Sequence, residues 1–258
     1  MTTESLYQAD IFLVGVGQFG LNQLTCEARE VIQRAKQVLH LTSFHSELCQ
    51  MNLACEDLSA LYWQSAPAWD VYQKLSERVV ESAIKSAPTV FAVHGNPLFF
   101  NDICWETVRL AKARGLLVQA LPGVSCIDVL PMQLGFDLGD LGAQIFEATQ
   151  LVMFGLSMNP YLSTLILQIA EFGIRGINVP LMTQQRITPM VEHLLKFYPP
   201  SHHIVFTKSK SDVDDRDLAL STTIDRCGEI LHRIVPGMTL YVPRVCIPEV
   251  VQEMDLNA

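Results

Sequence analysis

Three short glycine-containing segments hold the residues with the clearest chemical potential in this 258-residue chain. They are Gly15–Gly20 (GVGQFG), His94–Phe100 (HGNPLFF) and Pro122–Cys126 (PGVSC). A glycine lets a ligand approach the backbone closely, and a loop that precedes a helix offers free N–H groups to that ligand. The segments therefore predict a binding site for a nucleotide-like cofactor.

The first segment also has the G-x-G-x-x-G spacing of dinucleotide-binding proteins. That use expects an acidic residue about 20 positions later, at the end of the second strand. The corresponding region here reads VLHLTSFH, and the next acid is Glu47. We therefore consider it less favoured that this loop belongs to a dinucleotide-dependent dehydrogenase.

The elements around these segments indicate how they are positioned. Ala9–Gly15, Thr89–Val93 and Leu117–Leu121 are apolar runs typical of buried parallel strands, and each leads into one of the three segments. Apolar residues at helical spacing occupy 24–35, with Thr25 as N-cap, and also 71–86 and 102–114. Because ligands bind at the carboxyl ends of parallel strands, the three segments should share one edge of the sheet.

The pattern loosens into a glycine-rich stretch at 131–142, where we place a domain boundary. We predict two α/β domains, residues 1–130 and 131–258. The second contains ordered segments at 150–154, 161–171, 188–197 and 204–206, a solvated charged loop at Lys208–Asp217, and a last strand at Met238–Val242.

The charge and hydropathy pattern excludes several classes of partner. The formal net charge is −9, and lysine and arginine are scattered singly, which disfavours nucleic acid. The longest apolar runs, such as Leu162–Ala170, are shorter than the ~20 residues of a membrane-spanning helix. The N-terminus lacks the features of a signal peptide, so we expect a cytoplasmic protein that does not bind membranes.

The seven cysteines show no C-x-x-C pair and no histidines at zinc-finger spacing. We expect reduced thiols that mostly pack in the core, and no bound metal.

The order of the motifs resembles the tetrapyrrole methylase superfamily over about residues 10–245. The stretch from VGVGQFG to the following helix is similar to the first glycine loop and helix of that family. HGNP stands in the place of its Gly-Asp-Pro loop, PGVSC in that of Pro-Gly-Val-Ser-Ser, and Gly142–Leu151 also has counterparts. The resemblance implies a two-lobed α/β fold with a mostly parallel N-terminal sheet, a mixed C-terminal sheet and S-adenosylmethionine in the cleft.

Within the superfamily, the chain most resembles borosin-type peptide backbone N-methyltransferases and their bacterial relatives. LGFDLGDLGAQIFEATQLVMF is similar to a stretch of those enzymes that contains Gln-x-Phe-Glu-Ala. The resemblance implies a homodimer that methylates a peptide. Because VVQEMDLNA after the last predicted strand is too short for a substrate segment, we expect a separate precursor peptide.

The resemblance also implies the cofactor contacts. The methionine portion and ribose should lie against the second segment, with the third segment opposite, and the adenine should lie near residues of the second half. The implied cofactor-binding residues are Gly17, His94, Gly95, Asn96, Pro97, Leu98, Phe99, Ser125, Cys126, Gln144, Met182 and Thr239.

Two tyrosines are the candidate catalytic residues. An amide nitrogen is a poor nucleophile, so its methylation needs hydrogen-bonding groups that stabilise an imidate-like state. By resemblance, Tyr62 and Tyr72 stand where borosin enzymes carry tyrosines, whereas Ala68 stands where those enzymes carry an arginine. The alternative role of both tyrosines is packing beneath a loop.

Two other functions stay open. The first is methylation of a small molecule or a tetrapyrrole, although residues 40–106 offer only Lys74, Arg78 and Lys85 as permanent cations for a carboxylate-rich substrate. The second is a non-catalytic binding or regulatory domain, which Ala68 and the missing acid in HGNP both permit.

Overall fold

The computed structural model describes residues 8–209 and 219–246, which form two compact units. The first contains 8–129 together with 175–178, and the second contains 130–174, 179–209 and 219–246. Each unit has its own sheet and its own hydrophobic core. The assignment of 1–130 and 131–258 to two domains stays a prediction about which segments fold together.

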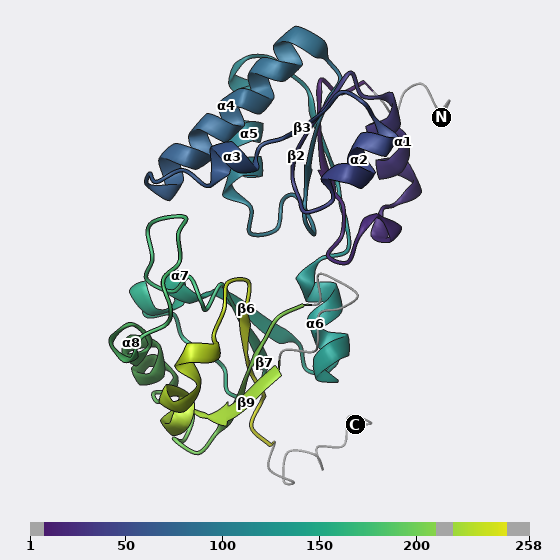
Figure 1. Ribbon diagram of the computed structural model, residues 1–258. Coiled ribbons are helices and arrows are strands. Elements are labelled where there is room, and N and C mark those ends of the chain that lie inside the picture. Colours follow the sequence, from purple (N-terminus) through teal and green to yellow (C-terminus); the bar gives the residue numbers. More distant parts are fainter. Residues whose placement is uncertain (1–7, 210–218, 247–258) are drawn as a thin grey trace, which may run out of the picture. The chain divides into compact units, whose positions relative to one another are not determined.

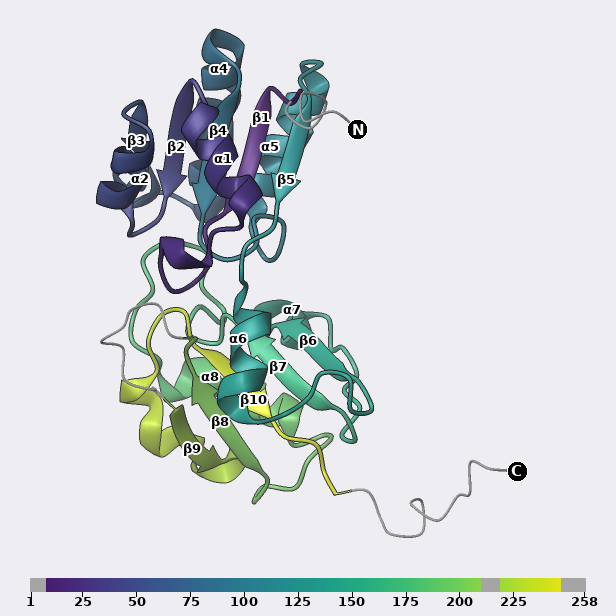
Figure 2. The ribbon, with the colours of Figure 1, turned by 90° about the vertical axis from the view of Figure 1, so that its right-hand side faces the viewer.

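The first unit is built on a parallel sheet of five strands, which confirms the predicted parallel arrangement. β1 lies between β4 and β5, with Ile11 opposite Thr89 on one side and Val118 on the other. Figure 2 shows the strands side by side in the order β3 (Cys55–Asp57), β2 (Gln37–Leu41), β4 (Thr89–Val93), β1 (Ile11–Gly15) and β5 (Val118–Leu121).

Helices cover both faces of this sheet. The central strand β1 is apolar throughout because alternate side chains enter opposite cores: Leu13 packs toward one face and Phe12 toward the other. One face is covered by α4 (Ala68–Ser86) and α5 (Asp102–Ala113), and the other by α1 (Cys26–Arg34) and α2 (His45–Met51) (Figure 1). Two short helices, η2 (Leu21–Gln23) and α3 (Ser59–Tyr62), complete the unit.

Side-chain caps fix the starts of two predicted helices. Thr25 Oγ1 accepts a hydrogen bond of 3.0 Å from the Ala28 N–H, which confirms the predicted cap of α1. Asn101 caps α5 in the same way, through the Cys104 N–H. The helix predicted from residue 71 begins earlier, at Ala68, because the Pro67 carbonyl already accepts helical hydrogen bonds.

The second unit contains the expected mixed sheet. β6 and β7 are parallel, whereas β10 is antiparallel to both of its neighbours, and β8 and β9 form an antiparallel pair. The strand order is β6 (Ala143–Glu147), β7 (Ser163–Leu167), β10 (Thr239–Val242), β8 (His203–Thr207) and β9 (Ala219–Thr223).

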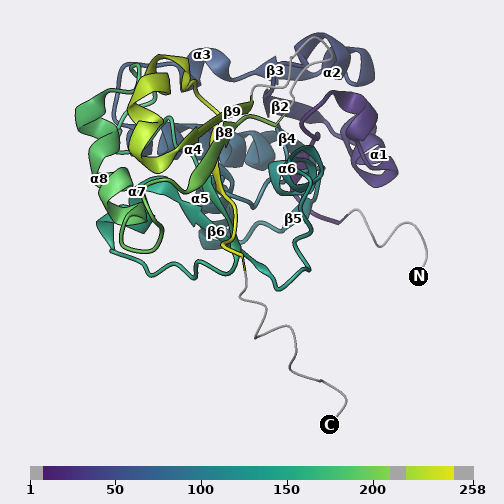
Figure 3. The same cartoon turned by 90° about the horizontal axis from the view of Figure 1, so that it is seen from below.

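Helices bury the apolar side chains of this second sheet. α7 (Ala148–Met153), α8 (Gln184–Leu194) and the 3-10 segment η3 (Ile224–Arg233) pack into one core with the strands. α8 and η3 contact each other directly, as Figure 3 shows. Ile166 and Leu240, which face each other across β7 and β10, are among the fully buried members of this core.

The expectation that most cysteines pack in the core is wrong. Only Cys104 and Cys227 are buried, and the other five are partly or fully exposed. All seven thiols are free. The reason is position, because these five lie at helix starts, in an edge strand, in a loop or, for Cys49, on a partly exposed face of α2.

Two sequence-level expectations concern surface properties. Among the residues that the structure describes, no helix combines the length and the apolar character needed to cross a membrane. The predicted charged loop at Lys208–Asp217 lies outside the described residues from position 210 onward.

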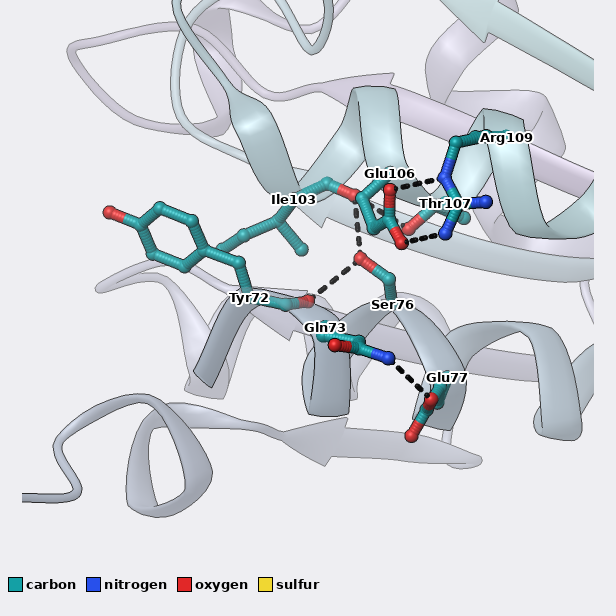
Figure 4. A network of polar contacts seen from close by, with 8 residues as sticks. All are labelled: Tyr72, Gln73, Ser76, Glu77, Ile103, Glu106, Thr107 and Arg109. Carbon is teal, nitrogen blue, oxygen red and sulfur yellow. Dashed lines mark hydrogen bonds and ion pairs between the residues drawn. The ribbon is translucent and has the colours of Figure 1, made fainter. Parts of the chain in front are cut away.

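A buried polar contact joins α4 to α5. The Ser76 hydroxyl lies 2.8 Å from the Tyr72 carbonyl oxygen and 2.9 Å from that of Ile103, so it links the two helices (Figure 4). One turn further along α5, Glu106 accepts two hydrogen bonds from Arg109, and these bonds lower the pKa of the Glu106 carboxyl. The Ser76 contact thus links α4 to α5, whereas the pair of Glu106 and Arg109 lies within α5.

We expect Ser76→Ala to lower the free energy of unfolding by about 1 kcal/mol, because one hydrogen bond between the helices is lost inside the core. The matched control is Gln73→Ala on the exposed face of the same helix, which should change it by less than about 0.5 kcal/mol. Urea unfolding measures both values. Equal changes in the free energy of unfolding for the two variants would show that the Ser76 hydrogen bond does not stabilise the contact between α4 and α5.

Candidate functional site

The three glycine segments meet at the carboxyl ends of β1, β4 and β5. A Cβ atom added to Gly123 would lie 2.5 Å from the Gly15 carbonyl oxygen and 2.6 Å from that of Gly95. A Cβ atom on Gly15 would collide with the same Gly95 oxygen. The three backbones are therefore in direct contact, which confirms that the segments share one edge of the sheet.

Hydrogen bonds continue from the sheet into the first two loops. The Val16 N–H donates to the Val93 carbonyl at 2.9 Å, and the Gly95 N–H donates to the Gly17 carbonyl at 3.0 Å. Gly17 and Gly95 have φ angles of +86° and +65°, a region that glycine adopts at little cost. The sequence therefore needs glycine at both positions for the loops to pair.

Gln23 closes the first loop from within. Its Oε1 accepts hydrogen bonds from the backbone N–H groups of Gln18 at 2.7 Å and Phe19 at 2.8 Å. Two of the N–H groups expected to be free for a ligand are thus used by the protein. The loop is therefore preformed, and it contributes its shape to a binding site rather than these two N–H groups.

The second loop is held at several points. His94 Nε2 accepts a hydrogen bond of 3.2 Å from the Ser43 N–H, so its ring faces the segment after β2. Asn96 Oδ1 accepts a hydrogen bond from the Leu98 N–H at 3.0 Å, which forms a local turn. Trp105 donates from its indole to the Leu98 carbonyl at 3.0 Å. These bonds fix the segment from His94 to Phe99.

The third loop passes into α6 (Cys126–Leu134) through reciprocal capping bonds. The buried Ser125 donates its N–H to the Asp128 carboxylate at 2.6 Å, and the Asp128 N–H donates to the Ser125 carbonyl. Burial raises the pKa of the Cys126 thiol, which disfavours a role as thiolate nucleophile. Ser125 and Cys126 thus border the same edge as the other two loops.

Three of the predicted cofactor residues belong to the second unit. Gln144 lies on β6, where its side chain makes three hydrogen bonds with Asn159 and Thr164. Met182 is buried, and its sulfur accepts a hydrogen bond of 3.2 Å from Arg186 Nε. Thr239 is buried at the start of β10. Their assignment to the cofactor stays a prediction.

The two candidate catalytic tyrosines are neighbours in the first unit. Tyr62 ends α3 and Tyr72 lies on α4, and their rings are nearly parallel with centroids 6.4 Å apart. Both are half-buried against the core beneath α4 and α5, and Trp63 packs edge-on against Tyr62. The structure thus brings the pair together, and their catalytic role stays a prediction.

An arginine lies beside the position where the resemblance expects one. The Ala68 N–H donates to the Arg175 carbonyl at 3.1 Å, and Pro67 pairs with Gly176 as an isolated antiparallel bridge. Arg175 itself is exposed. Sequence reasoning missed this residue because it lies far along the chain from Ala68, in a stretch with no motif of its own.

Comparison with known proteins gives one family and several relatives. The family model of Tetrapyrrole (Corrin/Porphyrin) Methylases matches residues 10–211. A methyltransferase/cyclic peptide dendrothelin A precursor of Dendrothele bispora is 24% identical over 90% of this chain and 57% of its own length. A methyltransferase/type II borosin cyclic peptide precursor of Phlebiopsis gigantea is 24% identical over 90% of this chain and 42% of its own length. The chain thus spans about half the length of these curated relatives.

Solved structures share the fold. A uroporphyrin-III C-methyltransferase from Thermus thermophilus matches with a TM-score of 0.64 and 17% identity, over 91% of each chain. A diphthine synthase matches with a TM-score of 0.62 and 12% identity, over 94% of this chain and 93% of its own. The comparisons confirm the resemblance drawn from the motifs, including the two-sheet α/β fold.

We expect Gly123→Ala to lower the free energy of unfolding by about 2 kcal/mol, because its Cβ atom must displace two backbone carbonyls. The control is Gly176→Ala, where an added Cβ meets no atom within 4 Å and the φ angle is not in the left-handed region. Thermal or urea unfolding of both variants measures the difference. If Gly123→Ala is as stable as the control, the three loops do not pack this closely.

Proposed function

This chain belongs to the tetrapyrrole (corrin/porphyrin) methylases, and we propose that it is an S-adenosylmethionine-dependent methyltransferase whose cofactor binds against the three glycine loops. The observation that supports this most is the backbone contact among Gly15, Gly95 and Gly123 at the carboxyl ends of adjacent parallel strands. Side chains at Gly15 and Gly123 would push the three loops apart, so glycine keeps the loops together at this edge. A Thermus thermophilus uroporphyrin-III C-methyltransferase of this fold was crystallised with S-adenosyl homocysteine.

The cofactor supplies a methyl group on a sulfonium, and the protein supplies position and hydrogen bonds. In-line displacement depends on fixed geometry, so preformed loops are well suited to it. Gln23, Asn96 and Asp128 each hold one of the three loops through backbone hydrogen bonds. This rigidity supports a binding site that needs little rearrangement.

The substrate that we propose is a precursor peptide, methylated at backbone nitrogen. The relatives from Dendrothele bispora and Phlebiopsis gigantea are named methyltransferase and cyclic peptide precursor at once. Tyr62 and Tyr72 lie together and can offer hydroxyl groups to the amide as it takes on imidate character. Arg175, next to Ala68, would supply the cation that Ala68 itself lacks.

The electrostatics of the first unit favour a peptide over a tetrapyrrole. Of the three cations on α4, Arg78 is paired with Glu56 at 2.5 Å. Lys85 lies at the end of α4 that leads into the start of β4, on the opposite edge of the sheet from the glycine loops. Lys74 alone among these three is then placed for a carboxylate-rich substrate.

We further propose that the enzyme acts as a homodimer in the cytoplasm. Light scattering can check the oligomeric state, and cell fractionation can check the location.

Cofactor binding can be tested by calorimetric titration with S-adenosylhomocysteine. Gly95→Ala should weaken binding at least tenfold, because the added methyl group narrows the approach to the loop backbone. Gly115→Ala is the matched control, since Gly115 has a similar φ of +73° but open space around it. Absence of binding to the unchanged protein at millimolar concentration would contradict the methyltransferase proposal and favour a non-catalytic domain.

Peptide methylation can be tested by co-expression with candidate precursor peptides and mass spectrometry for added CH₂ units. Tyr72→Phe and Arg175→Ala should keep cofactor affinity and slow turnover by about 100-fold each, because one stabilising donor is lost in each variant. Tyr161→Phe, at an exposed tyrosine of the second unit, is the control. Unchanged rates would show that Tyr72 only packs against the core and that Arg175 has no role in catalysis.

A further inference from the structure

Four metal-ligating side chains gather on the α1 and α2 side of the first sheet. His40 lies on β2, His45 and Cys49 lie on α2, and Cys55 begins β3. His45 and Cys49 are four residues apart on one helix, so they occupy the same face. None of the four takes part in the function proposed above.

The donor atoms of this cluster are close together. His40 Nε2 lies 2.9 Å from His45 Nδ1, and Cys49 Sγ lies 3.8 Å from the same His45 nitrogen. One ligand atom from each of His40, His45 and Cys55 lies within 4.8 Å of the other two. The Cys49 and Cys55 thiols also interact with each other. His40, His45 and Cys55 thus face one small volume, and Cys49 borders it beside His45 and Cys55.

These dimensions suit a tetrahedral zinc ion. Zinc binds nitrogen and sulfur at about 2.0–2.3 Å, so neighbouring ligand atoms of such a site lie about 3.3–3.8 Å apart. The separations of His45 Nδ1 from His40 Nε2 and from Cys49 Sγ, 2.9 and 3.8 Å, lie within about half an ångström of that range. Two thiolates also balance the double charge of the ion, which removes the cost of burying it beside the fully buried His40.

A second layer of contacts orients the first histidine. His40 Nδ1 lies 3.4 Å from both the backbone nitrogen and the Oγ1 of Thr42, so Thr42 orients the ring while Nε2 faces His45. The Asp57 carboxylate interacts electrostatically with both His40 and His45. Supporting groups of this kind accompany histidine ligands in metal sites.

We propose that His40, His45, Cys49 and Cys55 form a structural zinc site. Four protein ligands leave no open position for substrate, which is the arrangement of structural rather than catalytic zinc. The ion would join β2, α2 and the short edge strand β3. It would also stabilise the segment after β2, whose Ser43 N–H holds His94 of the second glycine loop.

The test uses the full chain, purified under reducing conditions and freed of metal by chelation. Added cobalt(II) should give a thiolate-to-metal charge-transfer absorption that saturates at one equivalent and disappears when zinc is added. Cys49→Ser and Cys55→Ser should each weaken or abolish this absorption. Cys26→Ser, at an exposed cysteine of the same unit, should leave it unchanged. No such absorption in the unchanged protein would overturn the proposal.

A second measurement needs no substitution, so it holds even where a variant fails to fold. Thiols of the unchanged protein are alkylated with and without zinc, and the sites are mapped by mass spectrometry. Zinc should protect Cys49 and Cys55 at least tenfold, while Cys26 reacts equally in both samples. Equal labelling of Cys49 and Cys55 with and without zinc would also overturn the proposal.

Discussion

The arrangement of the site depends on the backbone contact among Gly15, Gly95 and Gly123. Each carbonyl or amide occupies space that a side chain would need at the neighbouring glycine. Such contact is possible only if β1 lies between β4 and β5 with the register observed. One steric constraint therefore requires both this order of strands and glycine at these three positions.

Around this contact, polar side chains fix each of the three loops. Gln23, Asn96 and Asp128 bind backbone N–H groups of the loops that contain or follow the glycines. Rigid loops reduce the reorganisation that accompanies binding, which is the main contribution a protein can make to an in-line transfer. The helices α4 and α5, linked through Ser76, hold the aromatic pair of the same unit in place.

A second group of side chains that can bind ligands lies away from the glycine loops. The His and Cys residues at 40–55 come together because β2 and β3 are neighbouring parallel strands and α2 connects them on one face. Their spacing, H-x4-H-x3-C-x5-C, matches no zinc-finger pattern, so sequence reasoning assigned the thiols to the core. The Arg175 carbonyl likewise contacts the Ala68 N–H although the two residues are far apart in the sequence, because residues 175–178 belong to the first unit.

The sequence by itself determined the features that depend on local pattern. Apolar runs predicted β1, β4 and β5, Thr25 predicted a helix cap, and glycines after strands predicted loops at one edge, because these signals act over a few residues. Tertiary structure alone decided which distant residues touch. The backbone contact of three glycines, the pairing of Tyr62 with Tyr72 and the His and Cys cluster all require strands and helices to be packed, and no spacing along the chain encodes that packing.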